Sequence, residues 1–204
     1  MLLGTTEVID QIPNIISVLR LFLIVPVAYG ILYKHWEFVL IMLVIAGLTD
    51  LLDGYVARRF EWTSRFGEIV DPIADKVTFG GACVLLTLEG LWPLWLLTIV
   101  LAREGVILGG AAAYKLLYKR LDIEPTLLSK TNTIILVSVI VLEVIAQIDF
   151  KYQAIAARGL DVWGGYGLVA LFSITSGLDY VRLWGHRAYL EHKKQSSTDT
   201  DELP

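Results

Sequence analysis

Four aspartates stand at regular spacing within TDLLDGYVARRFEWTSRFGEIVDPIADK, residues 49–76. Asp50 and Asp53 are three residues apart and Asp71 and Asp75 are four apart, so on helices each pair shares one face. Clustered carboxylate oxygens suit a hard divalent cation, most naturally Mg²⁺ or Mn²⁺, and such cations are typically partnered by substrate phosphates. The residue types and their spacing therefore indicate phosphoryl-type transfer.

Small and basic residues between the aspartates fit the same chemistry. Gly54 lets a ligand or a neighbouring backbone approach closely, and Gly67 permits a turn or tight packing. Arg58 is placed to pair with phosphate oxygens or with one of the aspartates. The dipeptide Asp71-Pro72 is typical of a helix start, with the aspartate as the cap and the proline at the first helical position.

The elements that carry these residues are unusually apolar. Apolar residues make up 55% of the 204 positions, which exceeds the usual share in a soluble domain, and several runs approach the roughly 20 residues that cross a hydrocarbon core. We predict an all-α, polytopic integral membrane protein with six transmembrane helices, at residues 12–33, 36–58, 72–89, 92–118, 129–148 and 162–183. Residues 1–190 would form this transmembrane domain, and the polar residues 191–204 a solvated, mobile tail.

Membrane insertion restricts where the aspartates can lie. A carboxylate at the centre of a span costs about 2.5 to 3.5 kcal/mol, so four unpaired ones would oppose insertion by roughly 10 kcal/mol. At 1.5 Å per residue, Asp50 lies about 12 Å from Arg58 along the helix axis, close to one membrane surface. The aspartates must therefore be shallow, paired or bound to cations.

The distribution of Lys and Arg predicts the orientation. Basic residues gather in the loops after the second and fourth spans and in the C-terminal region, whereas the opposite side has only Lys34, Lys151 and Arg158. This bias places both termini and the aspartates in the cytoplasm of a multi-pass protein of the cell (inner) membrane. The single cysteine, Cys83, excludes a disulfide framework and a paired-thiol metal site.

The complete pattern resembles a known family signature. Asp50-x2-Asp53-Gly54-x2-Ala57-Arg58-x8-Gly67-x3-Asp71-x3-Asp75 is similar, without departure, to that of the CDP-alcohol phosphotransferases. The resemblance runs from IPNIISVLR to about GLDYVRLWG, nearly the whole chain. It implies six transmembrane helices, usually a homodimer, and a cytoplasmic site with divalent metal, two ions of Mg²⁺ or Mn²⁺. In that family an acceptor hydroxyl attacks the lipid-bearing phosphate of a CDP-linked lipid, and CMP leaves.

The resemblance also implies a role for each residue of the signature. The metal ligands would be the four aspartates, Asp50, Asp53, Asp71 and Asp75, with Asp75 also the general base. The CDP pocket would comprise Asp50, Asp53, Gly54, Ala57, Arg58 and Gly67.

Shorter segments indicate a branch of the family. AGLTDLLDGYVAR and DPIADK are similar to the enzymes that make phosphatidylglycerophosphate and cardiolipin, and PTLLSKTNT, residues 125–133, to the CMP-forming cardiolipin synthases. The substrates implied are CDP-diacylglycerol and phosphatidylglycerol, with glycerol-3-phosphate as the alternative acceptor. The acceptor-side cations would be Arg65, Arg103 and Lys130.

Several charged residues have a second interpretation. Arg103 and Glu104 either pair with each other or serve function, since charges inside a membrane are functional by default. Arg20 and Lys76 either balance the carboxylates or bind substrate. Lys130 is either an ordinary positive-inside anchor or an acceptor ligand.

Two other classes of function stay open at this stage. Intramembrane charges could line an ion or proton path in a transporter, although the carboxylates cluster at one surface and the chain shows no inverted repeat. A membrane scaffold would have no reason to contain four costly aspartates. The three histidines, His35, His186 and His192, lie at span ends or in the tail and are expected at the surface.

Overall fold

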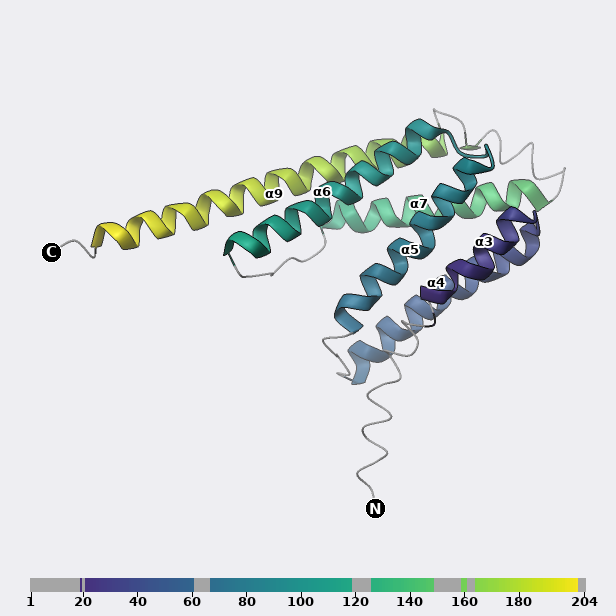
Figure 1. Ribbon diagram of the computed structural model, residues 1–204, viewed down its shortest axis with the longest axis horizontal. Helices are drawn as coiled ribbons and strands as arrows, with labels where there is room; N and C mark the ends of the chain where they lie inside the picture. Colours follow the sequence, from purple (N-terminus) through teal and green to yellow (C-terminus); the bar gives the residue numbers. More distant parts are fainter. Residues whose placement is uncertain are drawn as a thin grey trace, which may run out of the picture. The chain divides into compact units, whose positions relative to one another are not determined.

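The computed structural model describes residues 19, 21–60, 67–118, 126–148, 159–160 and 164–201 (Figure 1). Side chains are described for these residues except 50–60, 67–75, 115, 118, 188 and 190–201. Within the described ranges the chain forms helices and turns with no strand, which confirms the all-α class. The helices are α3 (Ile24–Leu32), α4 (Trp36–Phe60), α5 (Gly67–Leu88), α6 (Leu94–Tyr118), α7 (Leu127–Ile148) and α9 (Gly165–Asp201).

Two predicted boundaries are wrong. Helix α5 begins at Gly67, so Asp71-Pro72 lies inside the helix and is not its start. Pro72 follows the first turn, so α5 continues through it without the hydrogen bond to the carbonyl of Glu68. Helix α9 continues past Leu183 to Asp201, through most of the predicted tail, whose mobility stays a prediction.

The first unit contains residues 1–93 and 137–160, and within it α3 packs against both α4 and α5. Glycines allow the close approach: a Cβ on Gly30 would lie 2.6 Å from Val39, and one on Gly81 would lie 2.7 Å from Ile24. The core of this unit includes the fully buried residues Val27, Ile31, Val39, Ala82 and Leu86. Helix α3 thus contacts both of the helices that carry the aspartates.

The second unit contains residues 94–136 and 161–204, and there α6 and α9 lie side by side (Figure 1). Trp184 of α9 fits over Gly110 of α6, where a Cβ would lie 2.6 Å from the indole Nε1. The same indole contacts Tyr114, with ring centroids 5.2 Å apart. A glycine and an aromatic side chain thus set the spacing of this helix pair.

Among the residues that the structure describes, two stretches are long and apolar enough to cross a membrane, Leu94–Tyr114 in α6 and Leu127–Ile148 in α7. Shorter apolar stretches lie in α4 (Trp36–Thr49) and α5 (Lys76–Leu88). Large apolar side chains are exposed along these helices, including Leu116 and Leu127 at 81% and Ile134 at 68%. Exposed apolar surface of this kind is typical of contact with lipid or with another protein.

Candidate active site

The first two aspartates lie on a continuous helix. Helix α4 runs unbroken from Trp36 to Phe60, so it includes Asp50, Asp53, Gly54, Ala57 and Arg58. At three residues apart in this helix, Asp50 and Asp53 stand on the same face. The backbone therefore has the geometry that the spacing predicted, while the side chains of these residues lie outside the described set.

The second pair lies in the first turns of α5. Gly67 begins that helix, and Asp71 and Asp75 follow at a separation of four, which again gives one shared face. Phe60, at the end of α4, is seven residues before Gly67, so at most about 25 Å of extended chain separates the two helix ends. The two ends lie at the same end of the first unit in Figure 1.

The donor set suits a hard divalent cation. All four candidates are carboxylates, which supply the oxygen ligands that Mg²⁺ and Mn²⁺ prefer. Both pairs lie in helical backbone, which holds each pair on one face. Among the residues that the structure describes elsewhere, no three His, Cys, Asp or Glu side chains gather as metal ligands. The aspartate segment is therefore the candidate metal centre.

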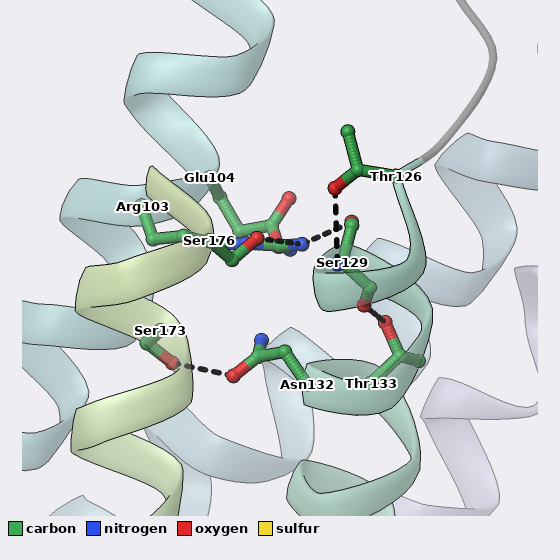
Figure 2. A network of polar contacts seen from close by, with 8 residues as sticks. All are labelled: Arg103, Glu104, Thr126, Ser129, Asn132, Thr133, Ser173 and Ser176. Atoms are coloured by element: carbon green, nitrogen blue, oxygen red, sulfur yellow. Dashed lines mark hydrogen bonds and ion pairs between the residues drawn. The ribbon is translucent and has the colours of Figure 1, made fainter. Parts of the chain in front are cut away.

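A different polar cluster lies in the second unit, around Arg103 (Figure 2). The Arg103 side chain is only 6% exposed, and its Nη1 pairs with Oε1 of the neighbouring Glu104. Its Nη2 donates to Oγ of Ser129 on α7 and, at 3.4 Å, to Oγ of Ser176 on α9. One guanidinium thus joins three helices. Its ion pair with Glu104 confirms the predicted pairing of these two residues.

A second polar contact lies one helical turn away from the first. The Ser173 hydroxyl on α9 donates to Oδ1 of Asn132 on α7 at 3.0 Å, and both residues are buried (Figure 2). Thr126 caps α7, since its hydroxyl accepts the N–H of Ser129 at 3.3 Å. We name the set Arg103, Glu104, Ser129, Asn132, Ser173 and Ser176 the polar ladder.

The predicted acceptor cations differ in their surroundings. Arg103 is held inside the polar ladder, whereas Lys130, the residue after Ser129, is exposed. Arg65 and Arg20 lie outside the described residues. Lys76 is partly buried and takes part in a polar or electrostatic contact. These positions do not test whether Arg65, Arg103 and Lys130 bind the acceptor, so that role stays a prediction.

Serines and an asparagine of the polar ladder did not stand out in the sequence. Ser129 and Asn132 are three residues apart in α7, and Ser173 and Ser176 are three residues apart in α9. Paired small polar residues at this spacing inside apolar helices were the available signal, since such side chains hydrogen-bond across helices in membranes. The signal identifies the faces of the helices but not which helices meet.

Comparison with known proteins identifies the family. Residues 10–171 match the CDP-alcohol phosphatidyltransferase family, a range that includes both aspartate pairs. The chain belongs to this family. The predicted family is therefore confirmed, and membership places the chain among transferases rather than among transporters or scaffolds.

Relatives within the CDP-alcohol phosphatidyltransferases have two kinds of name. A probable cardiolipin synthase (CMP-forming) of Drosophila melanogaster is 32% identical over 191 residues, 86% of this chain and 58% of that protein. The human cardiolipin synthase (CMP-forming) is 31% identical over 140 residues, 60% of this chain and 46% of that protein. A CDP-diacylglycerol–glycerol-3-phosphate 3-phosphatidyltransferase of Cereibacter sphaeroides is 42% identical over 107 residues, 48% of each chain. The chain thus spans about half the length of these relatives.

Proposed function

We propose that the protein transfers the phosphatidyl group of CDP-diacylglycerol to phosphatidylglycerol, forming cardiolipin and CMP. The observation that carries this proposal is the complete aspartate signature, placed on the helical backbone of α4 and α5 inside the family match of residues 10–171. Relatives named as CMP-forming cardiolipin synthases match 86% and 60% of the chain, which supports phosphatidylglycerol as the acceptor.

In the proposed reaction the acceptor hydroxyl attacks the phosphorus that bears the diacylglycerol. Asp75 accepts the hydroxyl proton, the new P–O bond forms, and the bond to the CMP phosphate oxygen breaks. Arg58, at the C-terminal end of α4, would hold phosphate oxygens of the CDP group, and Gly54 and Ala57 leave room for it because their side chains are small or absent. Each of these residues lies on α4 or α5.

Asp50, Asp53, Asp71 and Asp75 would hold the divalent cations, two ions of Mg²⁺ or Mn²⁺. When bound, such ions neutralise the charge of the attacking and leaving oxygens. The carboxylates can orient the phosphates only if α4 and α5 keep their positions. Helix α3 packs against both α4 and α5, which supports those positions.

We further propose six membrane spans, with the aspartates and both termini on the cytoplasmic side. The two apolar stretches in α6 and α7, the exposed apolar side chains and the distribution of Lys and Arg support this topology. A homodimer is proposed on the resemblance to the family. The orientation is tested with single cysteines introduced into the Cys83→Ala protein. Each cysteine is labelled with a membrane-impermeant reagent added to one side of the membrane at a time.

Glycerol-3-phosphate is the second candidate acceptor, since the relative from Cereibacter sphaeroides is 42% identical over 107 residues. Of the predicted acceptor-side cations that the structure describes, Lys130 is exposed, whereas Arg103 is engaged by Glu104, Ser129 and Ser176. A lipid phosphodiester has one negative charge and needs few cations, whereas a soluble phosphomonoester has two and favours several.

The test is a competition between acceptors. Purified protein receives CDP-diacylglycerol with phosphatidylglycerol and glycerol-3-phosphate together, and the lipid product is identified by mass. We expect cardiolipin as the main product. Phosphatidylglycerophosphate as the main product would reverse the assignment of the acceptor but keep the transfer chemistry.

A further inference from the structure

Two helices of the first unit end in the same hydrogen-bonded turn. At the end of α3, the N–H of Lys34 donates to Ile31 O at 3.1 Å and that of His35 to Gly30 O at 2.8 Å. At the end of α5, the N–H of Gly90 donates to Thr87 O at 3.0 Å and that of Leu91 to Leu86 O at 2.9 Å. Both are Schellman motifs, in which the residue after the C-cap of the helix adopts a left-handed conformation.

The two turns differ at the residue that must be left-handed. Gly90 has φ 74° and adopts this conformation without steric cost, whereas Lys34 has φ 58° and is the one non-glycine residue with positive φ in the described part of the chain. A β-carbon at this φ is unfavourable, and local strain of this kind is found where a side chain is needed. The α3–α4 turn therefore points to a role for the lysine side chain itself.

Lys34 lines an open cavity of about 530 Å³ at this turn. The lining includes Tyr29, His35, Trp36 and Glu37, together with Ile148 at the end of α7, all within the first unit. The Tyr29 ring lies 6.1 Å from the imidazole of His35, centroid to centroid. A cation, an anion and several aromatic rings thus surround one cavity.

The two charges of the cavity do not neutralise each other. Lys34 and Glu37 are both exposed, and neither forms an ion pair or a side-chain hydrogen bond with another residue in the described ranges. A ligand with one negative and one positive group would complement both side chains. The apolar and aromatic lining favours a ligand that is also amphipathic, because tyrosine and tryptophan rings favour the boundary between membrane and water.

We propose that this cavity binds the headgroup of a zwitterionic aminophospholipid. Its phosphate pairs with Lys34, and its ammonium group pairs with Glu37 and lies against the rings of Tyr29 and Trp36. A headgroup with only negative charge would be repelled by Glu37. The site is distinct from the aspartates, since Trp36 and Asp50 are separated by about 21 Å along α4.

The test measures which lipids the protein retains. Protein in nanodiscs made from equal amounts of phosphatidylethanolamine and phosphatidic acid, an anionic lipid that is neither proposed acceptor, is released into native mass spectrometry, and bound lipids are counted. The wild-type protein should retain phosphatidylethanolamine preferentially. Lys34→Gly should lower that retention about tenfold, as expected for loss of one hydrogen bond to a charged group. The same variant should unfold at a higher temperature, because glycine fits the left-handed position.

Two further variants separate the charge from the backbone. Glu37→Gln should bring the retention of the two lipids close to equality, since the cavity no longer prefers a cationic amine. Gly90→Lys places a lysine in the matched turn, where a Cβ meets no atom within 4 Å. It should lower the unfolding temperature and leave lipid retention unchanged. Equal phosphatidylethanolamine retention in wild type and Lys34→Gly, or preferential retention of phosphatidic acid by wild type, would overturn the proposal.

Discussion

The aspartate segment of α4 and α5 and the polar ladder around Arg103 both place polar groups in apolar helices, but their charges are arranged differently. The aspartate segment has four carboxylates of the same sign at helix positions that share faces. In the polar ladder, Arg103 is paired with Glu104 and hydrogen-bonded to Ser129 and Ser176. A bound cation would compensate the charges of the first region, whereas in the second the charges of Arg103 and Glu104 compensate each other.

We expect this difference to separate a site for chemistry from a site for packing. Charges of one sign repel unless a cation joins them, so changes there should affect activity more than folding. A self-compensated network joins helices, so changes there should affect stability more than chemistry. Four predictions test this contrast.

The largest expected effect is on turnover. Asp50→Asn, Asp53→Asn or Asp71→Asn should each abolish detectable transfer while the protein still inserts, because an amide is a poor substitute for an anionic ligand. Excess EDTA should do the same to the wild-type protein. The measurements are CMP release and the amount of protein in the membrane fraction. Near-normal rates in two of the three variants would contradict a metal site at these aspartates.

Asp75→Asn should divide binding from chemistry. We expect turnover to fall by about 10² to 10⁴, the usual contribution of general base catalysis, with CDP-diacylglycerol affinity much less affected. Equilibrium binding of CDP-diacylglycerol is compared with turnover in the same preparation. If affinity collapses together with turnover, Asp75 is chiefly a metal ligand and another group is the base.

Within the polar ladder, Arg103→Met should lower the free energy of unfolding by about 2 kcal/mol or more, because Glu104 and two hydroxyls lose their shared donor. Lys130→Met is the matched control, since it removes an exposed cation next to Ser129 and should change stability by less than about 0.5 kcal/mol. Unfolding in mixed detergent micelles measures both. An Arg103→Met protein as stable as wild type would show that the ladder does not hold the helices.

The smallest expected effect is at the second contact of the ladder. Ser173→Ala should cost about 1 kcal/mol, because it removes the hydrogen bond to buried Asn132. Thr175→Ala is the control on the same helix, since within the described part of the chain the Thr175 hydroxyl bonds only the carbonyls of Leu171 and Phe172 in its own helix. Equal losses in both variants would argue against a specific contact between α7 and α9.

Much of the helix pattern was predictable, because charges, prolines and glycines bound the apolar runs. The span predicted at 36–58 matches α4 (Trp36–Phe60), and that at 129–148 matches α7 (Leu127–Ile148). The start of α5 was not predictable in this way. The dipeptide Asp71-Pro72 looks the same in the sequence whether it begins a helix or lies in the second turn, as it does here. The end of α9 was missed because a polar sequence can continue an existing helix beyond the apolar run.

The site was predictable only where the residue types were unusual. Aspartates at fixed spacing stand out in an apolar chain, and the structure confirms that each pair lies in helical backbone, where this spacing favours one shared face. Serine and asparagine are common residues, so the sequence alone does not single out Ser129 or Ser176. Their role follows from the structure, in which Arg103 donates to both hydroxyls. Likewise, nothing in the sequence marks Lys34 as left-handed, because that conformation depends on how α3 and α4 pack.

The most direct test of the central claim is product balance with purified protein in nanodiscs that contain CDP-diacylglycerol and phosphatidylglycerol. CMP and cardiolipin are both measured by mass, in wild type and in Asp53→Asn. The account predicts equal amounts of CMP and cardiolipin from the wild-type protein with added Mg²⁺ or Mn²⁺, and neither product from the variant. CMP and cardiolipin formed at comparable rates by Asp53→Asn, or no CMP release by wild type with either acceptor, would contradict it.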